Sequence, residues 1–110
     1  MNTNDLPPAA KLAALIEAGR AANPDLSLDG RVYFFESQKC GCALAFAVLG
    51  TGEIQRVNED EIVIAAMRGA RFLKMPQKLT DAVEMEAFYG KSLDEICASL
   101  REGELAKVAA

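Results

Sequence analysis

The chain has 110 residues, of which 51% are apolar and 25% are charged, and its twelve basic and sixteen acidic side chains give a formal charge of -4. This length predicts one domain, residues 1–110, and the composition excludes an intrinsically disordered chain. Because a net negative charge repels phosphates and anionic lipid, we do not expect nucleic acid or a membrane as a partner.

The N-terminus lacks the basic start, apolar run and small-residue cleavage site of a secretory signal. The longest apolar run, residues 42–49, would form a helix about 12 Å long, whereas the hydrocarbon core of a bilayer is about 30 Å thick. The three cysteines are an odd number, which fits a reducing compartment better than a disulfide scaffold. We therefore expect a cytoplasmic protein without a membrane span.

The first predicted element is a helix over residues 6–22, followed by a loop over residues 23–30. Prolines suit the first turn of a helix, and Asn23 with Pro24 ends it. The apolar face has helical spacing and consists of Leu12, Leu15, Ile16 and Gly19.

Residues 31–36, "RVYFFE", are rich in β-branched and aromatic side chains and predict a short strand. Its expected partner is residues 53–57, "EIQRV". Between the two, residues 42–50 predict a helix capped by Ser37 or a neighbour and ended by Gly50, although a strand would also fit the short run. A helix that is apolar on every side belongs in the centre of a fold.

Three further helices are predicted in the second half of the chain. Asn58 and Glu61 match a capping box, and the face that follows consists of Ile62, Ala66, Gly69 and Leu73. Met75 and Pro76 should break this helix, and Thr80 should cap the next one, which runs to Gly90.

The last predicted helix begins at a second capping box, Ser92 to Glu95, and forms a hairpin with its predecessor about Gly90. Its apolar stripe consists of Leu93, Ile96, Cys97 and Leu100. The Ala-rich end should fray. The predicted fold class is mainly α, a compact bundle of four to five helices around a buried central helix, with a short two-stranded β element; the alternative is α+β.

Catalysis has little support, because the chain has no histidine and thus lacks the commonest general base and metal ligand. No motif indicates a cofactor or a complete metal site. The lone thiol Cys97 is expected to be buried by packing, because free cysteine behaves as a small apolar residue.

Cys40 and Cys42 are the candidate site residues, as a thiol redox or metal-binding pair. If both thiols lay at the start of a helix, its positive end and Lys39 would lower their pKa. A structural zinc site needs four ligands, however, and Cys-x-Cys alone is a weak motif. Packing is therefore the favoured interpretation of the pair.

A helix-turn-helix that binds nucleic acid is a second alternative for the hairpin about Gly90. The second helix of such a motif should present basic side chains to DNA, whereas this helix presents Asp94 and Glu95.

Two segments, "CALAFAVLG" and "GKSLDEICASL", resemble segments of small uncharacterised bacterial proteins. In those proteins a Cys-Ala-Leu helix recurs together with a Ser-capped closing helix that contains Glu-Ile. Cys97 departs from the alanine that often stands in the closing helix. The resemblance implies a small cytoplasmic protein from a bacterium or phage and implies no activity.

The leading functional hypothesis is a non-enzymatic module for protein interaction or regulation. Its expected partner is another protein or a second copy in a homodimer, because the apolar content of 51% exceeds what one small core is expected to hide.

Overall fold

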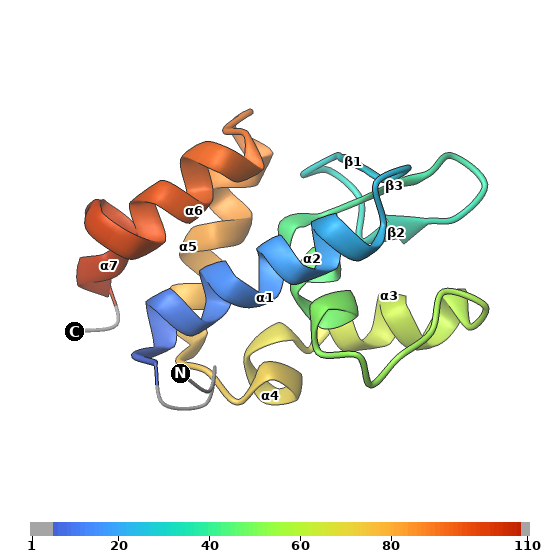
Figure 1. Ribbon diagram of the computed structural model, residues 1–110, viewed down its shortest axis with the longest axis horizontal. Coiled ribbons are helices and arrows are strands. Elements are labelled where there is room, and N and C mark those ends of the chain that lie inside the picture. The colour runs from blue at the N-terminus through green and yellow to red at the C-terminus, as the bar shows by residue number, and fades with distance from the viewer. Residues whose placement is uncertain (1–5, 109–110) are drawn as a thin grey trace.

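The computed structural model describes residues 6–108. Within this range, 62% of the residues lie in seven helices, and a small three-stranded mixed sheet completes the fold (Figure 1). The helices are α1 (Pro8–Ala22), α2 (Ala43–Gly50), α3 (Glu59–Met67), α4 (Gly69–Leu73), α5 (Gln77–Phe88), α6 (Leu93–Glu102) and α7 (Glu104–Val108). The strands are β1 (Ser27–Leu28), β2 (Phe34–Phe35) and β3 (Cys40–Gly41). The mainly α prediction is confirmed, with more helices and one more strand than expected.

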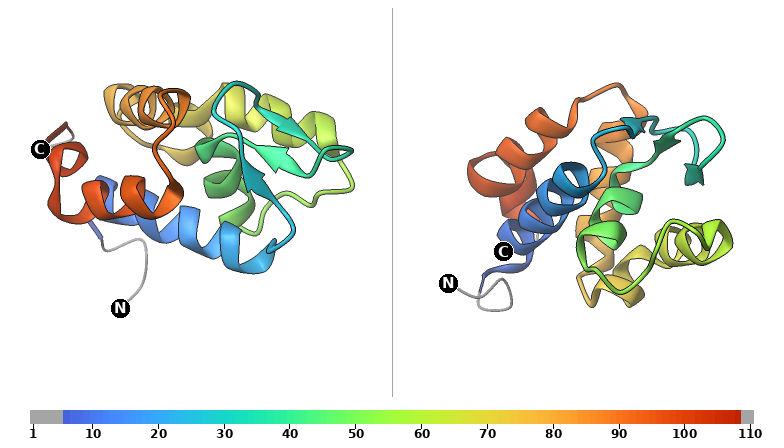
Figure 2. Two further views of the ribbon diagram at one scale, coloured as in Figure 1. Left: turned by 90° about the horizontal axis from the view of Figure 1, so that it is seen from above. Right: turned by 45° about the vertical axis from the view of Figure 1, so that its right-hand side comes forward.

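Helix α2 is the central element. All side chains from Ala43 to Leu49 are buried, and α1, α3, α4, α5 and β3 contact the helix. It lies among these elements in both views of Figure 2. The prediction that an all-apolar helix occupies the core is therefore confirmed. No helix within residues 6–108 has the length and apolar character needed to cross a bilayer.

Helices α1 and α2 pack with their backbones in direct contact. A Cβ atom on Gly19 would overlap the carbonyl oxygen of Phe46, and one on Gly50 would overlap the carbonyl oxygen of Leu15. Both positions therefore require glycine. The close approach explains how a helix as short as α2 is covered on its α1 side.

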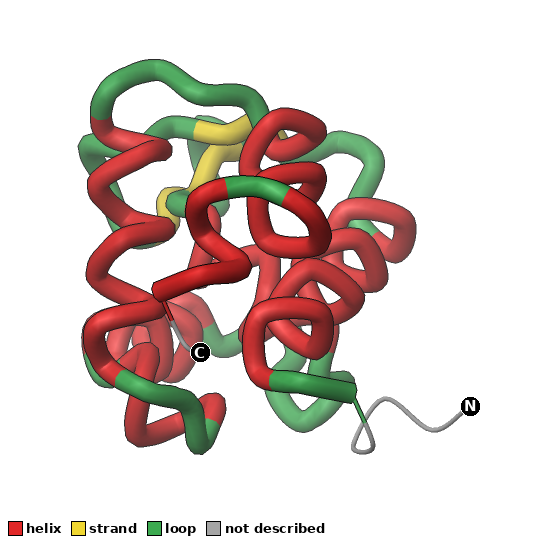
Figure 3. Tube along the Cα trace, turned by 90° about the vertical axis from the view of Figure 1, so that its left-hand side faces the viewer, coloured by secondary structure: helices red, strands yellow, loops and turns green. Residues whose placement is uncertain are grey.

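The predicted strand pairing was wrong. β2 is limited to Phe34–Phe35 and pairs antiparallel with β3, while β1 pairs parallel with β3 on the other side. The three strands lie close together, in the upper part of the view in Figure 3. The Asp29 carboxylate accepts hydrogen bonds from the backbone N–H and the guanidinium of Arg31. Arg31 therefore lies in a turn, although it was predicted to begin a strand. The segment 23–30, which was predicted to be a loop, contains β1.

Residues 53–57, expected as the partner strand, form turns instead and contribute Arg56. Its guanidinium donates two hydrogen bonds to Asp25, at 2.7 and 2.9 Å, and two to Glu36, at 2.9 and 2.7 Å. Lys39 adds a 2.8 Å ion pair to Glu36. The Arg56 cluster thus joins the loop after α1, the β2–β3 turn and the loop after α2.

Of the four side-chain helix caps that the sequence predicted, one is present. Ser92 accepts a hydrogen bond from the Glu95 backbone, and the Glu95 carboxylate accepts one from the Ser92 backbone, so this capping box is confirmed. Asn58 precedes α3 without a side-chain cap bond. Ser37 lies in the β2–β3 turn, and α2 begins after Cys42. Thr80 lies inside α5, which begins after Pro76, and its hydroxyl donates to the carbonyl of Gln77.

The helix predicted from residue 58 is divided at Arg68 into α3 and α4. The face predicted for this helix is nonetheless buried. Gly69 lies against the Leu44 side chain, and a Cβ atom added to Gly69 would lie 2.5 Å from Leu44 Cδ1. After α6, the Ser99 hydroxyl accepts a hydrogen bond from the Leu105 backbone at the start of α7. Residues 104–108 of the end that was expected to fray are therefore helical, and residues 109–110 lie outside the described residues.

Candidate functional site

The start of α2 is capped from another helix. Cys42, the residue before the helix, makes no side-chain cap bond, so the first backbone N–H groups of α2 need another acceptor. Glu84 of α5 provides it: the Leu44 N–H donates to Glu84 Oε1 at 3.3 Å. A carboxylate at this end also complements the positive end of the helix dipole.

Glu84 is half-buried, and burial raises the pKa of its carboxyl above the usual range. Hydrogen bonds from the Leu44 backbone and the Cys42 thiol oppose this shift, and the nearby negative charge of Asp81 adds to it. Ionisable groups with shifted pKa values in a cleft are candidates for functional sites.

A cleft of about 410 Å³, which we call the Glu84 cleft, opens beside this carboxylate. One wall is the α3–α4 junction with Met67, Arg68 and Arg71, and the other is the first half of α5 with Asp81 and Glu84. Tyr33 and Leu44 also line the cleft. The cleft therefore combines apolar side chains with charged groups on both walls.

A smaller hollow of about 170 Å³ shares Tyr33 and Glu84 with the Glu84 cleft and reaches Phe88. Three large apolar side chains line these hollows while exposed to solvent: Tyr33 at 44%, Met67 at 60% and Phe88 at 58%. Single exposed apolar residues are ordinary, but several around one depression are typical of interaction sites.

The structure separates the environments of Cys40 and Cys42. Cys40 lies in β3, opposite Phe35 and Ser27, whereas Cys42 is fully buried before α2. Both are free thiols. The lowered pKa values that a redox or metal-binding pair would need are not found: burial, with the Asp29 charge second, raises the pKa of Cys40, and burial raises that of Cys42 well above its ordinary value. Loss of hydration outweighs the helix end at Cys42.

Cys97 is buried in α6, as predicted, with its sulfur 3.8 Å from the carbonyl oxygen of Ala13. Burial raises the pKa of this thiol to about 11. Within residues 6–108, no three or more Cys, Asp or Glu side chains form a group that could hold a metal ion.

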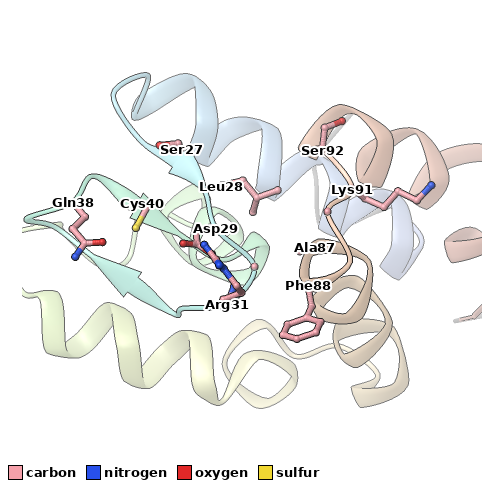
Figure 4. A pocket seen from close by; sticks show the side chains of 12 residues that line it. Ser27, Leu28, Asp29, Arg31, Gln38, Cys40, Ala87, Phe88, Lys91 and Ser92 are labelled. Atoms are coloured by element: carbon pink, nitrogen blue, oxygen red, sulfur yellow. The ribbon is translucent and has the colours of Figure 1, made fainter.

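A third hollow, of about 620 Å³, lies between the strands and the α5–α6 turn. Figure 4 shows Asp29 and Arg31 between Cys40 on one side and Phe88 on the other. Asp29 and Arg31 pair with each other at 3.2 Å. The charges in the middle of this hollow are thus already satisfied.

No protein-family model, curated protein or solved structure matches this chain.

The sequence interpretation missed Glu84, Arg68 and Arg71. A signal for Glu84 exists: it lies at the edge of the buried α5 face that contains Thr80 and Val83, and Cys42 is a poor cap for the helix that Glu84 meets. The two arginines follow the end of α3 and carry no pattern of their own.

Proposed function

We propose that this protein is a non-enzymatic interaction module that docks another protein chain at the Glu84 cleft. The observation that carries the proposal is the placement of Tyr33, Met67 and Phe88, three exposed apolar side chains, around two hollows that share lining residues. Aromatic residues and Met are enriched at protein interfaces, where burial of their apolar surface stabilises the complex. The three free cysteines favour a cytoplasmic setting, where thiols stay reduced.

The test is site-specific photo-crosslinking in native cells. Benzoylphenylalanine in place of Tyr33 should form an adduct with a protein, whereas the same group at Val57, which is 84% exposed outside the cleft, should not. The captured protein is then purified and titrated against the chain by calorimetry. Met67→Glu should weaken that binding, and Val57→Glu should leave it unchanged; equal effects of the two substitutions would contradict the proposal.

A second copy of the chain is one candidate partner. Sedimentation velocity over a wide concentration range tests this candidate. If the chain crosslinks to itself through position 33, sedimentation should also show a dimer whose fraction rises with concentration. A monomer at every concentration would remove the homodimer and leave docking of a different protein in place.

The thiol and nucleic-acid alternatives have less support. A thiolate is the reactive form of cysteine, and the raised pKa values keep Cys40 and Cys42 protonated at neutral pH. The α6 helix of the hairpin about Gly90 presents Asp94 and Glu95 in its exposed first turn, which disfavours contact with phosphates.

A further inference from the structure

The charges of the chain are segregated. Residues 62–80 contain four basic residues and no acidic one, which gives +4, while the other residues contain eight basic and sixteen acidic ones, which gives -8. The basic stretch covers most of α3, all of α4 and the start of α5. An acidic protein therefore carries one stretch whose only charged residues are basic, namely Arg68, Arg71, Lys74 and Lys78.

These four side chains have no ion-pair partner within residues 6–108, whereas seven other basic side chains in the same range do. All four are exposed. Basic side chains that make no ion pair raise the local positive potential and attract anionic groups.

Arg68 and Arg71 also line the Glu84 cleft, beside the apolar side chains of Met67 and Leu44. The opposite wall carries Asp81 and Glu84, and the Glu84 carboxylate is engaged by the Leu44 backbone. An anionic ligand is therefore attracted to the α4 wall and repelled from the α5 wall. This polarity orients whatever enters the cleft.

We propose that the Glu84 cleft binds an acidic protein segment, which inserts one apolar side chain between Tyr33 and Leu44 and sets carboxylates against Arg68 and Arg71. This inference rests on the proposed docking function and names the chemistry of the partner. A volume of about 410 Å³ accommodates one or two large side chains rather than a folded domain. Nucleic acid is disfavoured because its continuous phosphate chain would meet the charge of -8 carried outside the basic stretch.

The test uses a random twelve-residue peptide library displayed on phage. Selection on the full chain should enrich peptides that combine several Asp or Glu with one aromatic or aliphatic residue. An enriched peptide, synthesised with a fluorophore, should bind on the order of tenfold more weakly to Arg68→Glu/Arg71→Glu, and its affinity for the wild type should fall with added salt. Lys91→Glu/Lys107→Glu, an equal charge change at exposed sites in the α5–α6 turn and in α7, is the control and should change affinity far less.

The outcomes separate this inference from the proposed function. Enrichment of neutral apolar peptides whose binding is lost in Met67→Glu overturns the acidic partner and leaves protein docking in place. Binding of a labelled single-stranded or duplex oligonucleotide that Arg68→Glu/Arg71→Glu abolishes overturns the inference in favour of nucleic acid. An absence of any enriched peptide, with circular dichroism showing a folded chain, overturns the acidic segment, and the crosslinking experiment then decides the docking function independently.

Discussion

Cys42 shows how burial determines the role of a single residue. The side chain is fully buried at the start of the central helix, its thiol meets Glu84, and its pKa is raised rather than lowered. A small, weakly polar group fits this place without an unsatisfied strong donor. Packing, rather than reactivity, therefore accounts for its position.

We expect Cys42→Ala to reduce the free energy of unfolding by about 1 kcal/mol, because it removes one small buried group. Leu44→Ala and Phe46→Ala should each cost about 2–5 kcal/mol, because they leave larger cavities in the same helix. Urea titrations of the three variants give the ranking. The thiol would instead be a metal ligand if Cys42→Ala lowered the free energy of unfolding as much as Phe46→Ala does, and if a chelator destabilised the wild type to the same extent.

Glu84 should make stability depend on pH in the direction opposite to a salt-bridged carboxylate. Because its folded pKa lies above the unfolded value, the folded state holds a proton that the unfolded state releases, and the stability from this group falls as pH rises through the folded pKa. Wild type should therefore gain stability relative to Glu84→Gln as the pH falls from 7 toward 5. Thermal unfolding of both across this range is the measurement, with the exposed Glu102→Gln as the control for lost charge. A difference that is constant with pH would contradict the assignment.

At the scale of elements, the contact of α1 with α2 depends on two glycines. Gly19→Ala should destabilise the protein by about 1–3 kcal/mol or more, because the added methyl overlaps a backbone carbonyl that cannot move without shifting α2. Ala21→Ser, at an exposed position of α1, should change stability by less than about 0.5 kcal/mol. Chemical denaturation compares the two. A neutral Gly19→Ala would contradict the close contact of Gly19 with the Phe46 carbonyl.

The Arg56 cluster joins three loops, and its effect can be measured through Asp25. Hydrogen bonds from Arg56 lower the pKa of Asp25 to about 2. A carboxyl with a lowered folded pKa contributes stability above its unfolded pKa, near 3.8, and that contribution is lost as pH falls toward 2. In Arg56→Met the Asp25 pKa should rise toward its ordinary value, as followed by carbon NMR titration. Arg101→Met, which removes an ion pair on a different face, should leave the Asp25 pKa where it is.

The sequence predicted elements with a helical repeat and failed on the shortest ones. The stripe of α6 and the all-apolar α2 were recognisable, because burial follows a 3.6-residue period or a continuous run. β1 and β3 contain two residues each, too few for an alternating pattern, so no strand was predicted at Ser27–Leu28 or at Cys40–Gly41. Glu84 was missed because its role depends on which helix lies beside it. Local patterns do not encode that neighbour.

At the scale of the whole molecule, the buried residues form one connected core. This cluster runs from α1 through Phe34 of β2 and residues 43–49 of α2 to Leu105 of α7. When a protein unfolds, elements that share one core lose most of their apolar contacts at the same time. The sheet end, joined by the Arg56 cluster, is therefore expected to unfold with the helices rather than before them.

We accordingly predict a single two-state transition in urea, with a slope of about 1–2 kcal/mol per molar, as suits a chain of this size. The protein has two tyrosines and no tryptophan, so each tyrosine can be made the only fluorescent reporter. Tyr89→Phe leaves Tyr33, next to the sheet, and Tyr33→Phe leaves Tyr89, at the α5–α6 turn. Within each variant, the fluorescence midpoint should coincide with the midpoint from far-ultraviolet circular dichroism. A Tyr33 transition at lower urea than the loss of helix would show that the sheet end and the Glu84 cleft open separately, and the single-core prediction would then be wrong.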